Sequence, residues 1–295
     1  MDEKKRIDLL RPEKINVQEF YNRFGWQKTP DGLFKDTVAW VDLRPLLLPY
    51  YRRVRNRAKA FFKKKGDFFL DAGSGGISYP EYLEYAQGFS KQVCVDLSMV
   101  GLKEARDKLG ERGLYILGDM TLLPFRDEVF DAFACNHALY HVPADEQLQA
   151  LRELYRTLKA EATGVITYTW PFSPISDWIP MKNKSRLFGL VKKIFFSKTE
   201  SGPVLVEEIP PLYGHPHPPS WFRQVLDEVK IPYTMRVAQL IDPVFSRALI
   251  RENVWGRLLL GLLAFLEDWF PRWLSEKGRY PFIILKKQST DKTDS

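Results

Sequence analysis

The sequence predicts an α/β fold, in which a doubly wound and mostly parallel sheet carries helices on both faces. Three observations support this prediction. Short apolar segments alternate with amphipathic ones over residues 67–170, as in successive βαβ units. A glycine-rich bend, residues 71–78, follows the first apolar segment and leads into a helix. Aspartates stand at the ends of the first three apolar segments, so their carboxylates should share one edge of a parallel sheet.

The alternation assigns the elements in order. We expect seven strands, at residues 67–71, 92–96, 114–117, 129–135, 164–170, 233–241 and 280–287. The intervening helices are expected at residues 79–88, 98–109, 144–158 and 220–229. The Ser98 hydroxyl should cap the second of these helices, and a leucine stripe marks the third.

Segments that interrupt or flank this pattern define the remaining organisation. The predicted division is a helical N-terminal lid or extension at 1–66, a core at 67–170, a proline-rich cap insertion at 171–217, the C-terminal half of the sheet at 218–287 with a helical insertion at 242–279, and a polar tail at 288–295. The cap insertion is too long for an ordinary connection, which predicts a functional role.

Composition indicates a folded protein with a sizeable core, because 45% of its 295 residues are hydrophobic. The longest apolar run, residues 258–266, is far shorter than the roughly 20 residues of a membrane span. A secretion signal would begin with a basic segment and continue with an apolar one, whereas residues 1–14 are charged. We therefore expect a soluble, cytoplasmic protein. Cys94 and Cys135 fall in predicted strands and are expected to be buried thiols.

The net charge of +7 owes much to a run of cations without an intervening acid: Arg52, Arg53, Arg55, Arg57, Lys59, Lys63, Lys64 and Lys65. A solvated helix face is the favoured interpretation. The alternative is attraction to phosphates or to an anionic membrane surface.

The glycine-rich bend predicts a ligand site, because main-chain N–H groups at a helix start bind polar groups. The dinucleotide pattern fails at Ser78, and no Gly-Lys-Ser/Thr follows to hold a triphosphate. Asp71 would repel a pyrophosphate but suits a sulfonium or an ammonium. Asp96 is placed to hold ribose hydroxyls, and Asp119 to accept an adenine amino proton. The three acids favour a cationic nucleoside.

Four sequence blocks resemble the class I S-adenosylmethionine-dependent methyltransferases. They are "FLDAGSGG", "VCVDLSMVGLKEARDKL", "LGDMTLLPFRDEVFDAFACNHALYHV" and "LRELYRTLKAEATGVIT", in that order. The resemblance covers about residues 67–170. Within the family, the four blocks are similar to the small-molecule, type 11 branch, which includes ubiquinone/menaquinone-type enzymes. It implies a Rossmann-like sheet of seven strands, the last antiparallel. The first strand would separate the second and fourth, which keeps Cys94 and Cys135 from bridging.

The resemblance also implies S-adenosyl-L-methionine as cofactor and assigns residues to it. The methionine end would contact Asp71, Gly73, Gly75 and the neighbouring Ala72 and Ser74, with Asn136 lining the same part. Asp96 would bind ribose, and the adenine would contact Leu97, Asp119 and Met120. Tyr21 and Trp26 look like the family's lid segment.

One residue departs from the family pattern, since Ile77 stands where glycine is usual. A β-branched residue is expected to keep φ negative there, which would shift the bend and lower affinity for the cofactor.

The four histidines are the candidate bases for deprotonating an acceptor: His137 and His141 after the fourth strand, and His215 and His217 at the end of the cap insertion. A zinc site at the second pair is disfavoured, because no third ligand stands at a fitting spacing. We expect no metal.

The predicted reaction is in-line methyl transfer to a hydroxyl, or to a carbon, of a small or lipophilic acceptor. The Asn/Asp-Pro-Pro-aromatic tetrad of enzymes that methylate nucleic-acid amines is replaced here by "CNHALYH". The amphipathic stripe of residues 242–279 and aromatic residues of the cap favour an apolar pocket: Trp255, Leu258, Leu259, Leu262, Leu266 and Phe270, with Trp170, Phe172, Trp178, Phe188, Phe195 and Phe196. Together with the cations of residues 52–65, they predict a peripheral membrane contact.

Three other functions stay open. The positive charge permits an RNA methyltransferase, although no RNA-binding module is visible. Ile77 permits a non-catalytic protein that binds S-adenosylmethionine and regulates or assembles others. A protein that binds NAD is the most distant alternative.

Overall fold

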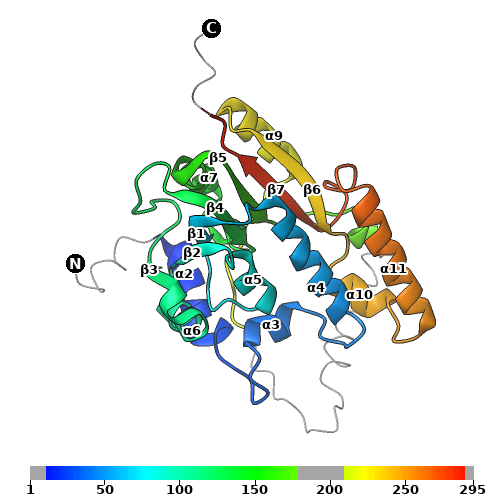
Figure 1. Ribbon diagram of the computed structural model, residues 1–295. Coiled ribbons are helices and arrows are strands. Elements are labelled where there is room, and N and C mark those ends of the chain that lie inside the picture. The colour runs from blue at the N-terminus through cyan, green and yellow to red at the C-terminus, as the bar shows by residue number, and fades with distance from the viewer. Residues whose placement is uncertain (1–10, 179–208, 290–295) are drawn as a thin grey trace.

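Seven strands form one mixed sheet in the computed structural model of the chain, which describes residues 11–178 and 209–289 (Figure 1). The strands are Gly66–Ala72 (β1), Phe89–Asp96 (β2), Gly113–Leu117 (β3), Phe130–Asn136 (β4), Leu158–Thr167 (β5), Tyr233–Gln239 (β6) and Tyr280–Lys286 (β7). Their order across the sheet is β3-β2-β1-β4-β5-β7-β6. The first five pair in parallel, whereas β7 runs antiparallel to both β5 and β6. The predicted fold, with an antiparallel last strand, is confirmed.

Helices cover both faces of this sheet. They are Pro12–Phe20 (α2), Lys35–Trp40 (α3), Leu48–Arg57 (α4), Pro80–Tyr85 (α5), Met99–Leu109 (α6), Gln147–Thr157 (α7), Pro219–Glu228 (α9), Pro243–Leu249 (α10) and Val254–Trp269 (α11). One core cluster joins the sheet to α4, α10 and α11, and a second joins it to α7 and α9. The Ser98 hydroxyl accepts the Gly101 N–H at 3.0 Å, which confirms the predicted cap of α6.

Strand β5 differs most from its expected bounds. It begins at Leu158, six residues before the expected start at Gly164, because a register shift against β4 accommodates the extra residues. It also ends at Thr167, so Trp170 lies beyond the strand. That side chain is fully buried against Phe222 of α9, which makes it a core residue and not part of a pocket wall.

The amphipathic stripe of residues 242–279 does not line a pocket as the sequence suggested. Helix α11 buries the other side of its cylinder, Leu260, Leu263 and Ala264, in the core. Trp255, Leu258 and Leu262 of the stripe are exposed to solvent instead. The helix is apolar on two opposite sides, and periodicity alone cannot tell which of them faces the core. Phe188, Phe195 and Phe196 of the cap lie outside the described residues, as does most of that insertion.

The basic run of residues 52–65 is not a uniformly solvated face, which corrects the favoured interpretation. Arg55 and Arg57 of α4 are largely buried and bind acids from distant parts of the chain. Arg55 contacts Glu81 at 2.9 Å, and Arg57 contacts Glu267 at 2.8 Å. The exposed members of the run are Arg52, Arg53, Lys63, Lys64 and Lys65.

Cys94 in β2 and Cys135 in β4 are buried free thiols. Strand β1 lies between their strands, as expected, so the two residues are not neighbours in the sheet.

Candidate functional site

The glycine-rich bend leaves β1 at the carboxyl edge of the sheet, beside the ends of β2 and β4. Gly73 and Gly75 have φ values of 68° and 48°, a region that glycine adopts at little cost. Neighbouring side chains also leave no room for a Cβ at either glycine. A Cβ on Gly73 would lie 2.3 Å from the Ala138 Cβ, and one on Gly75 would lie 1.9 Å from the Trp26 ring. Trp26, from the N-terminal region, therefore packs directly against the bend.

Asp96 connects the bend to the end of β2. Its carboxylate accepts the Gly75 N–H at 2.8 Å and the Ser98 N–H at 2.7 Å. Burial raises the pKa of Asp96 to about 6, although these hydrogen bonds oppose the shift. Burial likewise raises the pKa of Asp71 to about 7, and the Gln92 amide donates to that carboxylate at 2.9 Å. Both acids are held in place by hydrogen bonds, while the loss of solvation on burial favours their neutral form.

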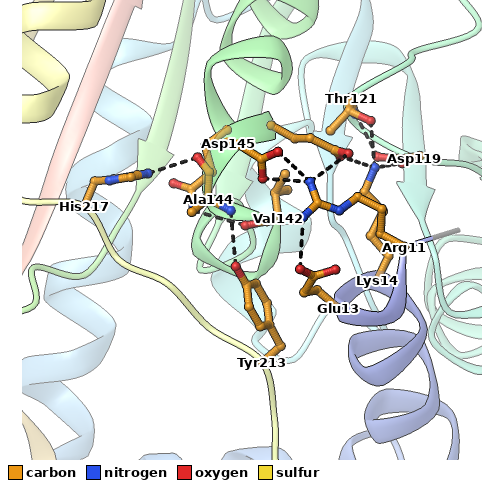
Figure 2. A network of polar contacts seen from close by, with 12 residues as sticks. Arg11, Glu13, Lys14, Asp119, Thr121, Val142, Ala144, Asp145, Tyr213 and His217 are labelled. Atoms are coloured by element: carbon orange, nitrogen blue, oxygen red, sulfur yellow. Dashed lines mark hydrogen bonds and ion pairs between the residues drawn. The ribbon is translucent and has the colours of Figure 1, made fainter.

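Asp119, the third strand-end acid, is bound by the N-terminal helix. Figure 2 shows Lys14 of α2 reaching Asp119 and Thr121. The Lys14 Nζ lies 2.5 Å from the Asp119 carboxylate and also pairs with Glu146. Arg11, at the start of the same helix, binds Asp145 at 2.7 Å. These ion pairs fasten α2 over the predicted adenine end of the site.

A cavity of about 840 Å³ extends from these acids across the carboxyl edge of the sheet. Most of the predicted cofactor residues line it: Tyr21, Asp71, Gly73, Ser74, Asp96, Leu97, Asp119, Met120 and Asn136. Ala72 and Gly75 do not, because Ala72 is fully buried in the core and Gly75 packs against Trp26. The volume lies within the roughly 300–1,000 Å³ of small-molecule sites.

The structure separates the four histidines. His137 and His141 line the cavity, whereas His215 and His217 do not. His217 stacks on Trp221 and faces the Ala144 carbonyl oxygen at 3.1 Å (Figure 2). Among the residues that the structure describes, no three acids, cysteines or histidines group as metal ligands.

Hydrogen bonding distinguishes the two histidines of the cavity. Both ring nitrogens of His141 have neighbours, the Tyr213 carbonyl oxygen at 2.6 Å and the Tyr21 hydroxyl at 3.4 Å. The His137 imidazole makes no hydrogen bond within residues 11–178 and 209–289. Burial lowers the pKa of both rings to about 4, so both are neutral near pH 7. His137 alone presents a neutral ring with unoccupied nitrogens to the cavity.

The expected conformation of Ile77 is wrong. Its φ is +50°, in the left-handed region that β-branched residues seldom adopt. The side chain is 2% exposed and packs in a cluster with Leu102 and Leu109 of α6. The Ile77 carbonyl oxygen also accepts from Lys108 at 2.7 Å. Packing and this hydrogen bond hold a conformation that the residue alone would avoid.

The far end of the cavity contains residues that sequence reasoning did not assign to the site. Asp36 of α3 lines it, and burial raises the pKa of this carboxyl to about 7. Arg55 and Arg247 approach from α4 and α10, with the Arg55 guanidinium 3.9 Å from the Tyr79 ring centre. Further aromatic side chains complete this chamber: Trp40, Tyr51, Tyr79, Tyr82, Tyr140, Tyr280 and Phe282. The one signal in the sequence for Asp36 was its position, as an acid within the aromatic-rich segment expected to form a lid.

Comparison with known proteins agrees with this geometry. A family model described as a methyltransferase domain matches residues 70–166. A ubiquinone/menaquinone biosynthesis C-methyltransferase of Cereibacter sphaeroides is 27% identical over 154 residues, covering 50% of this chain and 60% of that protein. An uncharacterised protein of Methanocaldococcus jannaschii is 28% identical over 155 residues, covering 51% and 59%. The match thus spans about 60% of the length of these curated relatives.

Two solved structures share the fold over nearly the whole chain. Geranyl diphosphate C-methyltransferase of Streptomyces coelicolor has a TM-score of 0.52 and 14% identity, covering 94% of this chain and 98% of that one. A phosphoethanolamine N-methyltransferase of Haemonchus contortus has a TM-score of 0.57 and 10% identity, covering 96% and 51%. Both were crystallised with S-adenosylhomocysteine. At these identities the likeness concerns the fold alone.

Proposed function

This chain carries a class I S-adenosylmethionine-dependent methyltransferase domain, and we propose that it methylates a hydroxyl, or a carbon, of a small or lipophilic acceptor. One observation carries the proposal. A single cavity joins the three strand-end acids to the neutral ring of His137 and to the aromatic chamber beyond it. Donor and acceptor would therefore meet within one continuous cavity.

The residues at one end of the cavity fit the donor. Three carboxylates, Asp71, Asp96 and Asp119, line it, and they suit an ammonium, ribose hydroxyls and an adenine amino group respectively. Tyr21 and Trp26 close this end, with their rings stacked 5.1 Å apart. When bound, S-adenosylmethionine supplies a methyl group already activated by the sulfonium charge, so the protein mainly positions the acceptor and excludes water.

His137 is the proposed base for a hydroxyl acceptor. A base must be unprotonated before the reaction and must have a nitrogen available to the acceptor. The lowered pKa and the unengaged ring meet both conditions. As the acceptor oxygen forms its bond to the methyl carbon, the bond from that carbon to the donor sulfur would break, and S-adenosylhomocysteine would leave as a neutral thioether. The acceptor proton would pass to His137, which then releases it to solvent.

The chamber around Asp36 indicates an aromatic or amphiphilic acceptor. Tyrosine rings offer flat apolar faces, while Arg55, which is paired with Glu81, and Asp36 place polar groups at separate points of the wall. The Asp36 charge reaches Tyr21 and Tyr79, whose pKa values are raised first by burial and then by this carboxylate. A ligand with one polar group on an apolar frame matches such a wall.

Calorimetry with S-adenosylmethionine is the first test, with NAD as the control ligand. Asp96→Ala should abolish binding, whereas Asp127→Ala, at a side chain 71% exposed, should retain it. Phenols, quinols and lipids are then screened for release of S-adenosylhomocysteine. Turnover on such an acceptor supports the proposal. Donor binding without turnover on any acceptor class would instead favour a non-catalytic binding protein.

A further inference from the structure

Helix α11 carries a large apolar surface that the described protein leaves uncovered. We call it the α11 outer face, and it comprises Trp255, Leu258, Leu262, Phe265, Trp269 and Trp273, the last just beyond the helix. Trp255 is 77% exposed and Trp269 is 70% exposed. Figure 1 shows α11 at the periphery, far from β3. Side chains this large rarely gather on a surface without a binding partner.

The face is not a displaced part of the core. At a helical repeat of about 100° per residue, Trp255, Leu258 and Leu262 share one side of the cylinder. Leu260 and Leu263 lie on the opposite side and are buried against the sheet. Helix α11 thus already has its packing partner, and the outer face is additional apolar surface.

Exposed arginines flank the face at its two ends. Arg251 precedes the helix and Arg272 follows it, and neither makes an ion pair with any described residue. Arg257 is exposed and unpaired as well, but it lies on the other side of the helix, with Leu260 and Ala264. By contrast, Asp268 on the same helix is paired with Arg57 at 3.0 Å. Glu252 is an exposed acid, but it lines a cavity with Arg257 on the other side of the helix, so Arg251 and Arg272 give the outer face a positive border. Tryptophans stand at both ends of the helix, as they do where proteins meet the headgroup region of a bilayer.

We propose that the α11 outer face binds the surface of an anionic lipid bilayer. Among the described residues, no helix is both long and apolar enough to cross a membrane, so α11 would lie along the surface. Its 16 residues span about 24 Å, with tryptophans near each end and the arginines placed to meet lipid phosphates. The element proposed here is α11, and not the basic helix α4, whose buried arginines are already paired.

A lipid surface fits these charges better than a second copy of the chain does. Two copies that met face to face would bring the same unpaired arginines together, which is unfavourable. An anionic surface neutralises them and covers the apolar face as well. This inference does not depend on methyl transfer. Helix α10 lines the cavity through Val244 and Arg247 and leads directly into α11, so a bound bilayer would lie near the cavity wall.

The test is co-sedimentation of the full chain with phosphatidylcholine vesicles, either pure or containing about 30% phosphatidylglycerol. We expect binding to the anionic vesicles that weakens in high salt. The variant Leu258→Glu/Leu262→Glu should reduce binding at least tenfold, because it places charges in the buried interface. Leu122→Glu is the matched control, since Leu122 is an exposed leucine 76% accessible, far from α11, and it should bind as wild type.

A second variant separates charge from apolar contact. Replacing Arg251 and Arg272 with glutamine should weaken binding to anionic vesicles by about fivefold per residue and reduce the salt dependence. All altered side chains are exposed, and thermal unfolding verifies that each variant folds. Wild-type levels of vesicle binding by the Leu258→Glu/Leu262→Glu variant would overturn the proposal. So would a vesicle-independent dimer in sedimentation velocity that this variant dissociates.

Discussion

The ammonium of Lys14 lies 2.5 Å from the carboxylate of Asp119, and this pair joins the N-terminal helix to the third strand-end acid (Figure 2). Lys14 is only 6% exposed, and Glu146 is its second acidic partner. The resemblance assigns Asp119 to the adenine of the cofactor. The pair therefore connects the position of helix α2 with the shape of the proposed donor site.

Replacing Lys14 with methionine should destabilise the protein by about 2–3 kcal/mol, because it leaves Asp119 and Glu146 close together without a cation. This value is below that for a fully buried pair, since the two acids are 20% and 27% exposed. Urea unfolding measures the change, and calorimetry should show weaker donor binding. Arg11→Met is the control from the same network, and its more exposed ion pairs should contribute little. Equal midpoints for the two variants would contradict the proposed role of Lys14.

The positive φ of Ile77 predicts an unusual order of stability among variants at this position. Alanine at this site loses the buried side chain but keeps the unfavourable positive φ, whereas glycine loses the side chain and relieves the backbone. Ile77→Gly should therefore be more stable than Ile77→Ala by about 1 kcal/mol, although both are less stable than wild type. Leu102→Ala and Leu102→Gly, in helix α6 of the same cluster, should show the reverse order. Chemical denaturation decides between these outcomes.

Asp71 should make stability and donor binding depend on pH. Its pKa is about 7 in the folded chain and about 3.9 when unfolded, so the folded state holds the proton more tightly. The stabilisation that protonated Asp71 contributes is therefore fully present below about pH 4 and is lost as the pH rises to about 7. Between pH 4 and 8, the free energy of unfolding of Asp71→Asn should rise by up to about 4 kcal/mol relative to that of the wild type.

Donor binding should respond to the same proton in the opposite sense. A cationic ligand is bound by the ionised carboxylate, so wild-type affinity should increase from about pH 6 to 8. Asp71→Asn should remove most of this increase, with the remainder arising from Asp96 near pH 6. Calorimetry across this range is the measurement, and an equal slope in the variant would exclude Asp71 from the site.

His137→Asn should lower turnover by about 10²–10⁴-fold while leaving donor affinity unchanged. Asparagine tolerates the positive φ of this position, 55°, so the backbone should persist. Because the His137 pKa is about 4, the wild-type rate should not depend on this group above about pH 5. His217→Asn, outside the cavity, is the control and should keep full activity. A fully active His137→Asn would exclude this residue as the base.

The local pattern was sufficient for the sheet. Alternating strands and helices of ordinary length fixed the βαβ units, and the Ser98 cap followed from its neighbours alone. The acids at the strand ends converge on one cavity because parallel strands place their carboxyl ends at one edge. In these parts a residue's position depends on its immediate sequence, which is why the convergence of the three acids could be predicted.

Tertiary structure decided the rest. Ile77 has a positive φ because α6 buries its side chain, and His137 differs from His141 only through the groups around each ring. Asp36 reaches the cavity because α3 folds over the sheet. Local sequence fixes periodicity and main-chain preference, whereas burial, charge pairing and the choice between two apolar sides of α11 depend on segments distant in sequence. The sequence by itself therefore determined the sheet and the acids at its edge, and only the packed chain determined the aromatic chamber, the unengaged ring of His137 and the exposed α11 outer face.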